Sequence, residues 1–526
     1  MPKQPNFILF VTDQHRADHL GCYGHAVLRT PHIDALAAEG VAFDKFFVTS
    51  PVCMPNRASL MTGRMPSSHG VWTNGTPLST DHVTFVDLLR RAGYDTALIG
   101  KSHLQNFAPA GPALRQPAAP EGVRATDPDT DFATRSGFDA DGYDQELPAH
   151  WAGADPTVSL PFYGFDHVDL VTGHGDGAGG AYGRWLRSQR PDAGDLIGAA
   201  NQAPHDYTVP QAVRTQVPEE LYTTNWIADR AIDWIENRPD PDKPYFLMVS
   251  WPDPHHPFNP PGKYWDMYRP EDMAVPEAFT RPDWTPPFYV QDMIDARAAG
   301  SATTTSFGSF ACSEREALEA RALTCGMIAM IDDALGRICD TLHATGTWEN
   351  TVKIFTADHG DHLGDHKLLL KGPEHYDQIT RVPFIWSDPE GPSGTREAGL
   401  AQTHDIGPSI LARARVQASF GMQGQPLPVA GGTARDAALI QFDMQRGNPR
   451  LGPIPRVHTV HDGRYRMSIF DGVPDGELYD TVTDPGEFLN LWHDPQAAPA
   501  KAAMMECFVR LEIAVADRLP EPRGLA

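Results

Sequence analysis

Two pairs of adjacent polar residues have the composition of a metal site. Asp13-Gln14 and Asp358-His359 each follow a short apolar run, and together they offer two carboxylates, an amide oxygen and an imidazole. Oxygen-rich sets of this kind suit Ca²⁺, Mg²⁺ or Mn²⁺, and the imidazole favours Mn²⁺ or a softer ion. Either pair alone would be read simply as the turn after a strand. Because both pairs follow strands of one expected sheet, a metal is the better interpretation.

The segment PVCMPNRASLMTGR, residues 51–64, raises a separate question because it contains Cys53. The six cysteines of the chain form no CxxC pair, and six in 526 residues are too few for a disulfide framework. By itself, Cys53 could be an inert buried thiol, half of a disulfide, a metal ligand, a nucleophile or the precursor of another group.

Five basic or titratable side chains could neutralise a bound anion. They are Arg57, Lys101, His103, His255 and Lys371. A tetrahedral oxyanion needs several donors around its oxygens, and fixed charge of this kind supplies most of the catalysis of group transfer. Each of the five alone would more commonly be a solvated residue. Lys101 and His103 are stronger candidates, because they follow an apolar run and would share one face of a strand.

Short apolar runs separated by helical segments must position these residues. The runs expected to be buried strands are residues 7–12, 96–100, 245–250, 352–356 and 382–386. Helices are expected over residues 31–39, 83–92, 218–237 and 314–345. Strands that alternate with helices predict an α/β fold with a mostly parallel, doubly wound sheet.

Polar side chains follow four of these five runs. The chain runs from the strands into Asp13-Gln14, into Lys101 and His103, into Asp253 with His255-His256, and into Asp358-His359. Ligands of open α/β sheets bind beyond the carboxyl ends of the strands. One polar strand end is usually only the beginning of a loop, but four together predict an active site.

Length and charge narrow the possible functions. A chain of 526 residues is too long for one ordinary core, so we expect a large domain and a smaller one. The net charge of −25 comes with no basic stripe, which argues against nucleic acid as a partner. An acidic surface does not attract anions from a distance, so local cations must hold an anionic substrate.

The expected domains are a catalytic domain over residues 1–430 and a small C-terminal α+β subdomain over residues 431–526. Residues 105–217, rich in Pro, Gly, Ala and Asp, are expected to be an irregular insertion or lid, in which residues 163–186 could form part of a pocket wall. A hairpin signal at His461-Asp462-Gly463 predicts antiparallel strands in the C-terminal part. Since no leader or membrane span is evident, we expect a cytoplasmic protein with no membrane partner.

The segment CMPNRASLMTGR resembles the sulfatase signature, C-x-P-x-R followed by T-G-R. Further similar segments are ILFVTDQHRADHLGCYG, ALIGKSHL, PHHPF, FTADHGDHLGDHKLLLKG and ELYDTVTDPGEFLNL, so the resemblance extends from about residue 7 to residue 491. It implies an alkaline-phosphatase-like α/β core, a small C-terminal sheet domain, and a formylglycine made from Cys53 by a separate maturation enzyme. A homo-oligomer is also expected, because relatives often assemble.

The resemblance also implies roles for individual residues. One divalent metal, Ca²⁺ or Mn²⁺, would be bound by Asp13, Gln14, Asp358, His359 and the formylglycine oxygen at position 53. Arg57 would hold the formylglycine, Lys101 would contact diol and substrate oxygens, and His103 would take a proton. His255 and Lys371 would stabilise or protonate the leaving oxygen, with His255 preferred to His256. Asn74 would donate a hydrogen bond to a substrate oxygen.

Two departures from the common sulfatase pattern leave the substrate open. Many sulfatases have paired aspartates where this chain has Asp13-Gln14, and Asp-Asn where it has Asp358-His359. Both changes resemble the phosphonate monoester hydrolase and phosphodiesterase branch, whereas Lys101 and His103 resemble sulfatases. The favoured substrate is a small anionic ester, an aryl or small alkyl sulfate. The alternatives are a phosphonate monoester or phosphodiester, and choline sulfate without clear support. A non-catalytic binding protein is disfavoured because the residue set is complete.

Overall fold

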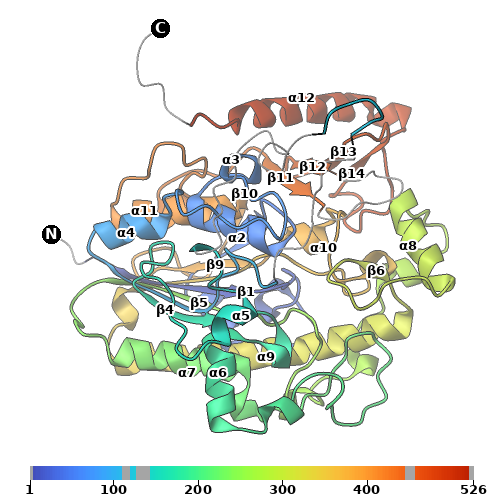
Figure 1. Ribbon diagram of the computed structural model, residues 1–526. Helices are drawn as coiled ribbons and strands as arrows, with labels where there is room; N and C mark the ends of the chain where they lie inside the picture. Colours follow the sequence, from blue (N-terminus) through green and yellow to red (C-terminus); the bar gives the residue numbers. More distant parts are fainter. Residues whose placement is uncertain (1–3, 109–118, 126–141, 445–455, 520–526) are drawn as a thin grey trace, which may run out of the picture.

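A central sheet of eight strands forms the body of the protein (Figure 1). The computed structural model describes residues 4–108, 119–125, 142–444 and 456–519. The strand order is β10-β2-β9-β7-β1-β5-β3-β4. The bounds are β1 Asn6–Thr12, β2 Val41–Phe47, β3 Asp95–Lys101, β4 His167–Val171, β5 Tyr245–Ser250, β7 Thr351–Ala357, β9 Phe384–Ser387 and β10 Thr395–Gln402. The predicted α/β fold with a mostly parallel sheet is confirmed.

The central strands are apolar along their whole length because both faces of the sheet are covered. Every residue of β1, β5 and β7 is buried, and β1 pairs in parallel with β5 and with β7, so that Leu9 lies between Met248 and Ile354. Continuous apolar runs are the expected pattern for such strands. All five predicted runs are strands of this sheet.

The predicted direction of one of these strands is wrong. From the sequence, the run at residues 382–386 is expected to be a strand of a parallel sheet. β9 is antiparallel to both of its neighbours, β2 and β7. The chain between β7 and β9 has no helix that runs back along the sheet; it contains β8 (Leu368–Leu369), α10 (Asp377–Thr380) and loops. It therefore re-enters the sheet at the end where it left.

Three strands escape the sequence pattern because they are partly exposed. In β2, β4 and β10 polar or half-buried residues interrupt the apolar run, and β4 and β10 lie at the edges of the sheet. β4 belongs to the segment 105–217, which is therefore not irregular throughout. It pairs in parallel with β3, and α6 (Gly180–Gln189) packs on it.

Helices cover both faces of the sheet (Figure 1). One layer contains α1 (Pro31–Ala38), α7 (Thr223–Glu236) and α9 (Glu314–Ala344). The opposite layer contains α2 (Cys53–Thr62), α4 (Phe85–Arg91) and α11 (Ile406–Ala414). The four helices predicted from sequence are present, although α7 is preceded by a short 3-10 turn. Shorter or peripheral helices are α3 (Pro66–His69), α5 (Pro148–Trp151), α8 (Phe288–Ala298) and α12 (Ala498–Ala514).

The C-terminal part of the chain forms a separate antiparallel sheet, as predicted. Its strands, in spatial order, are β11 Ala438–Asp443, β12 Arg456–His461, β13 Tyr465–Phe470 and β14 Gly476–Asp480. The predicted hairpin joins β12 to β13, and α12 packs on these two strands (Figure 1). A small apolar cluster, Phe47, Leu400, Ala438 and Ile440, links this sheet to the central one. The boundary near residue 430 stays a prediction.

A two-stranded ribbon completes the described strands. β6 (Phe310–Ala311) pairs with β8, which shortly precedes Lys371. Within the described residues, none of the helices has the length and apolar character needed to cross a bilayer.

We expect the approach of β3 to β5 to depend on Gly100. Its φ is +112°, and a Cβ there would overlap the carbonyl oxygen of Ser250 on β5. Gly100→Ala should therefore destabilise the protein by about 3 kcal/mol or more, because it adds a backbone clash to an unfavourable φ. Gly93→Ala is the matched control, since φ is +97° there but the space is open, and it should cost about 1 kcal/mol. Equal losses in urea unfolding would show that the close approach is unimportant.

Candidate active site

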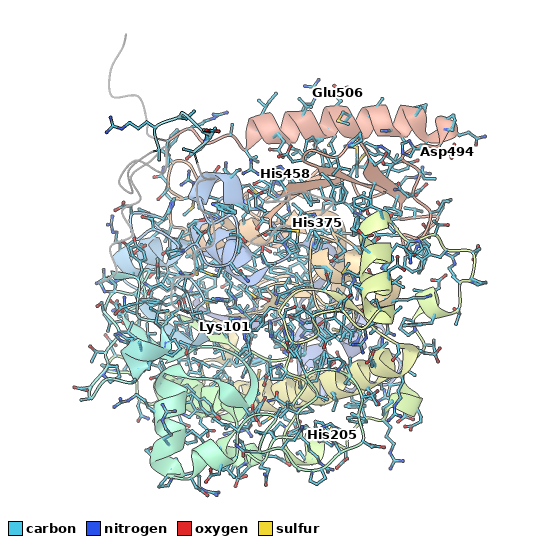
Figure 2. The ribbon with its side chains drawn as sticks, turned by 45° about the vertical axis from the view of Figure 1, so that its right-hand side comes forward. Lys101, His205, His375, His458, Asp494 and Glu506 are labelled. Carbon is cyan, nitrogen blue, oxygen red and sulfur yellow. The ribbon has the colours of Figure 1, made fainter. Side chains whose placement is uncertain are left out.

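The four predicted strand ends meet the N-terminus of α2 inside the molecule. Cys53 is the first residue of α2 and is 1% exposed. Asp13 and Lys101 are completely buried, and Figure 2 shows Lys101 in the interior, far from the surface residues Asp494 and Glu506. The carboxyl ends of parallel strands thus gather charged side chains that the sequence separates by hundreds of residues.

Asp13 is the most strongly paired of these charges. Lys101 Nζ donates a hydrogen bond to Asp13 Oδ2, and Arg57 Nη2 lies 3.8 Å from the same oxygen. Burial by itself would raise the pKa of the Asp13 carboxyl, but the surrounding cations, Lys101 first among them, hold that pKa well below its usual range. Asp13 is therefore an ionised carboxylate.

Asp358 is fixed by hydrogen bonds to both of its carboxylate oxygens. Arg57 Nε donates to Oδ2 at 2.7 Å, and the backbone N–H of Gln14 donates to Oδ1 at 3.1 Å. Asn56, inside the cysteine motif, donates from Nδ2 to the carbonyl oxygen of Asp358 at 2.6 Å. One turn of α2 thus positions the segment that carries Asp358 and His359.

Four buried residues form a group that fits a divalent cation. The ligand atoms of Asp13, Cys53, Asp358 and His359 all lie within 4.8 Å of one another. Cys53 Sγ is 3.2 Å from His359 Nε2 and 3.7 Å from Asp13 Oδ1. His359 Nδ1 donates to the carbonyl oxygen of Gly360 at 2.9 Å, which leaves Nε2 with its lone pair toward the group. Burial lowers the pKa of His359 to about 4, so the imidazole is neutral, as a ligand must be.

Gln14 reaches the same place with a different set of bonds. Its φ of +63° turns the chain sharply after β1, and its Oε1 accepts a hydrogen bond from Lys371 Nζ at 2.8 Å. Its Nε2 contacts His256 Nδ1 at 3.1 Å and donates to Asp361. Gln14 thus contacts the group through its backbone N–H, which bonds to Asp358, while its side chain bonds to residues beside the group and its role as a metal ligand stays a prediction.

Lys371 and His255 form a pair beside the cysteine. Lys371 Nζ lies 2.8 Å from His255 Nε2 and 3.6 Å from Cys53 Sγ. His255 Nδ1 lies 2.5 Å from the carbonyl oxygen of His256, which can only accept, so Nδ1 carries the hydrogen. Burial lowers the pKa of His255 well below its usual value, so Nε2 accepts from the lysine ammonium.

His103 lies in a loop and does not continue the strand that carries Lys101, which corrects the prediction of a shared strand face. β3 ends at Lys101, and His103 has a φ of +56°. The buried carboxylate of Glu146 holds this loop by accepting the backbone N–H groups of His103, Leu104 and Gln105 at 2.9–3.1 Å. Burial lowers the pKa of the His103 imidazole, which is therefore neutral, and its Nδ1 has no hydrogen-bond partner among the described residues.

Asn74 lies close to the start of α2. Its Oδ1 accepts the backbone N–H of Met54 at 3.0 Å. This bond satisfies one of the free donors of the first helical turn and leaves Nδ2 as the group that could face a substrate oxygen. The substrate contact itself stays a prediction.

Sequence reasoning missed His174, because it did not identify β4. His174 follows the carboxyl end of β4 by three residues, so the strand-end rule would have found it. Its Nε2 lies 2.8 Å from Lys101 Nζ and 3.5 Å from Asp13 Oδ2, and its ring stacks on His255 at 3.7 Å. Glu146 and Asp361 were also missed, because both accept hydrogen bonds from backbone N–H groups, which leave no pattern in the sequence; Asp361 in addition accepts from Gln14 Nε2.

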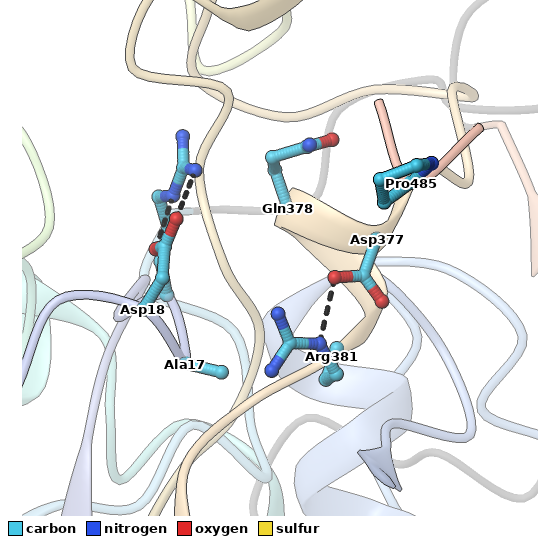
Figure 3. Close-up of a pocket in the computed structure, with 7 residues that line it drawn as sticks. Ala17, Asp18, Asp377, Gln378, Arg381 and Pro485 are labelled. Atoms are coloured by element: carbon cyan, nitrogen blue, oxygen red, sulfur yellow. Dashed lines mark hydrogen bonds and ion pairs between the residues drawn. The ribbon is translucent and has the colours of Figure 1, made fainter. Parts of the chain in front are cut away.

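Arg16, outside the buried group, connects the loop after β1 to the loop that follows Asp358, through His362 and an ion pair with Asp365 of 2.6 Å. Arg16 forms a bidentate pair with Asp18 and donates to the carbonyl oxygen of His362 at 2.7 Å. Across a surface pocket, Asp377 and Arg381 of the α10 region form a second pair (Figure 3). The loop after β1 is thus tied to the loop that follows Asp358.

Comparison with known proteins gives consistent matches over nearly the whole chain. A family model described as Sulfatase matches residues 5–416. An arylsulfatase of Clostridium perfringens is 28% identical over 93% of this chain and 90% of its own length. The multifunctional alkaline phosphatase superfamily protein PehA of Trinickia caryophylli is 28% identical over 99% of this chain and 98% of its own length. The crystal structure of the phosphonate monoester hydrolase of Agrobacterium radiobacter superposes with a TM-score of 0.77 at 26% identity. The match covers 99% of this chain and 98% of the hydrolase chain.

We predict that added Mn²⁺ or Ca²⁺ stabilises the chelator-treated protein through the buried group. A ligand at about 100 times its Kd raises the free energy of unfolding by about 2.7 kcal/mol, which thermal unfolding detects without any substrate. His359→Asn should shift the larger stabilisation from Mn²⁺ toward Ca²⁺, because it replaces a nitrogen ligand by a carbonyl oxygen.

The control is His32→Asn, in a separate group of potential ligands, His32, Asp332 and Asp333, in which His32 and Asp333 are exposed and Asp332 is buried. It should leave both stabilisations unchanged. If the metal-induced stabilisation disappears in His32→Asn and persists unaltered in His359→Asn, the buried group is not the metal site.

Proposed function

Because the chain belongs to the sulfatase family, we propose that it hydrolyses aryl or small alkyl sulfate monoesters through a formylglycine derived from Cys53. The observation that carries the proposal is the position of Cys53. Its Sγ lies 3.2 Å from His359 Nε2, 3.7 Å from Asp13 Oδ1 and 3.6 Å from Lys371 Nζ. A nucleophile at this position is therefore next to a carboxylate, an imidazole and a lysine.

A formylglycine explains why a cysteine occupies a site built for oxygen chemistry. Its aldehyde adds water to give a gem-diol with two hydroxyl groups. One diol oxygen attacks the sulfur, the bond from sulfur to the leaving oxygen breaks, and the alcohol departs with a proton. The second hydroxyl is then deprotonated, the carbon–oxygen bond to the sulfate breaks, and sulfate leaves as the aldehyde re-forms. Hydrolysis of a covalent ester is thus replaced by an elimination.

The charges around Cys53 suit this sequence of steps. Lys101, Arg57 and Lys371 provide fixed positive charge for the sulfuryl oxygens, which matters most where charge develops and water is excluded. The Lys371 ammonium, bonded to neutral His255, is the proton donor on the side of the leaving oxygen. His103, neutral and with a free Nδ1, is the base for the second hydroxyl. Asp13, Asp358 and His359 would hold a divalent cation, which would supply Lewis acidity toward oxygen.

A second candidate function is hydrolysis of phosphonate monoesters or phosphodiesters at the same site. It is favoured by Gln14 and His359, and by the similarity to the Agrobacterium radiobacter phosphonate monoester hydrolase and to multifunctional PehA. Both activities need the same nucleophile and cations, so one can accompany the other. Under either function, conversion of Cys53 requires a separate maturation enzyme.

The first test of the proposal is the mass of the peptide that contains Cys53. The aldehyde replaces CH₂SH by CHO, so the peptide should be about 18 Da lighter than its unmodified form. Cys53→Ala should abolish turnover and leave the far-UV spectrum and melting temperature near those of the wild type. Cys325→Ala, which changes a cysteine that is likewise buried but packed in the core beneath the sheet, should stay active. Turnover by Cys53→Ala would refute the assignment of residue 53 as the nucleophile.

The second test separates the two functions by their selectivity. We expect kcat/KM for 4-nitrophenyl sulfate to exceed that for a phenyl phosphonate monoester, since Lys101 and His103 resemble the sulfatase pattern at the strand end that follows β3. Both substrates should be measured on one preparation with its aldehyde content determined by mass spectrometry. A larger kcat/KM for the phosphonate would reverse the order of the two proposals.

A further inference from the structure

An exposed aromatic side chain stands directly over the buried histidines of the site. Phe307 is 64% exposed, yet its ring centroid lies 6.0 Å from those of His174 and His255 and 5.6 Å from that of His256. His255 and His256 are at most 1% exposed and the His174 side chain is 10% exposed. Exposure therefore increases outward from His255 through His174 to Phe307, which marks the direction in which the site opens to solvent.

The backbone of Phe307 is fixed relative to the proton donor. Its neighbour Gly308 pairs with Lys371 in a parallel bridge, directly before β6 pairs with β8. On the other side, Gln211 Nε2 donates to the carbonyl oxygens of Thr304 and Ser306 at 3.0 and 3.2 Å. The backbone that carries the ring is thus held in register with the lysine proposed to serve the leaving oxygen.

Phe107 provides a second aromatic surface next to the same opening. Its ring stacks on His103 at 3.9 Å with an interplanar angle of 6°, and it lies 6.0 Å from the His174 ring. The His174 ring therefore contacts both phenylalanine rings, each at a centroid distance of 6.0 Å. The six rings of Phe107, His103, His174, His255, His256 and Phe307 are joined by ring contacts with centroid distances of 3.7–6.4 Å, and we call this set the ring layer.

The positive charges near the ring layer favour an uncharged leaving group over a cationic one. Lys101 Nζ lies 5.5 Å from the Phe107 ring centroid, and Lys371 Nζ bonds to His255. These ammonium groups would repel a quaternary ammonium, although aromatic rings alone could bind one. A flat uncharged ring, in contrast, gains edge and face contacts with phenylalanine and covers apolar surface that is otherwise in water.

We propose that Phe307 and Phe107 bind an aromatic leaving group, so that the enzyme prefers aryl esters to alkyl esters. This inference rests on the proposed function, because it places the leaving oxygen beside Lys371 and His255. Phe307 is a specificity-determining residue and takes no part in proton transfer. Phe107 is the secondary contact, since the ring of His103 already covers one of its faces.

The test compares leaving groups in Phe307→Ala, Phe307→Tyr and the wild type. Phe307→Ala should lower kcat/KM for 4-nitrophenyl sulfate about tenfold and that for ethyl sulfate less than about twofold, the lost contact being with the ring alone. Phe307→Tyr should keep most of the preference. Phe420→Ala is the matched control, because Phe420 is 68% exposed and has no ring contact with the ring layer in the described part of the chain. It should change neither rate.

Three results would overturn the inference. They are an equal loss for aryl and ethyl sulfate, no loss for aryl sulfate, or a larger loss for choline sulfate, which would indicate a cation-binding cage. A change in melting temperature above about 3 °C in Phe307→Ala would assign the ring a structural role. If the wild type cleaves phosphonates and not sulfates, the proposed function fails separately. Phenyl methylphosphonate and ethyl methylphosphonate then replace the two sulfate esters. Phe307→Ala should again lower kcat/KM about tenfold for the phenyl ester and less than about twofold for the ethyl ester.

Discussion

The contact of the Asp13 carboxylate with Lys101 and Arg57, inside the molecule, is the interaction on which the site depends. An ionised carboxylate without water is very costly unless cations and hydrogen bonds surround it, and here the cations come from β3 and α2. Removing one member of such a group costs about 3–5 kcal/mol, because the remaining charge stays buried. The relative placement of β1, β3 and α2 is therefore fixed by electrostatics as well as by apolar packing.

The same charges make the site suitable for sulfuryl transfer. Arg57 joins the two carboxylates by reaching Asp358 through Nε and Asp13 through Nη2, and its Nη1 donates to the carbonyl oxygen of Lys101 at 3.1 Å. Cys53, four residues earlier on α2, is thereby held next to both. Preorganised charge of this kind needs no rearrangement as the reaction proceeds.

The sequence predicts those parts of the site that follow strongly apolar strands. Asp13, Gln14, Lys101, Asp358 and His359 are found in this way, because β1, β3 and β7 are buried on both faces and read as continuous apolar runs. His174 is missed because β4 is an edge strand with three half-buried residues, so that no such run precedes it. The direction of β9 is also missed, since an apolar run carries no information on strand direction.

Other features depend on contacts between distant backbone segments and leave no sequence pattern. Glu146 is one example, because its carboxylate accepts backbone N–H groups some forty residues away. The position of Phe307 is another, since it follows from the bridge between Gly308 and Lys371. Local residue types predict which groups are available, whereas long-range pairing decides which of them meet.

The central claim is that position 53 presents an oxygen nucleophile to a cation held by Asp13, Asp358 and His359. A crystal structure of the matured enzyme with Mn²⁺, with an anomalous map at the manganese edge, tests it most directly. The claim predicts one strong peak at about 2.0–2.6 Å from oxygen or nitrogen atoms of these three residues and from an oxygen on the side chain at position 53. A thiol sulfur at position 53, or a peak only at His32 and Asp332, would contradict it.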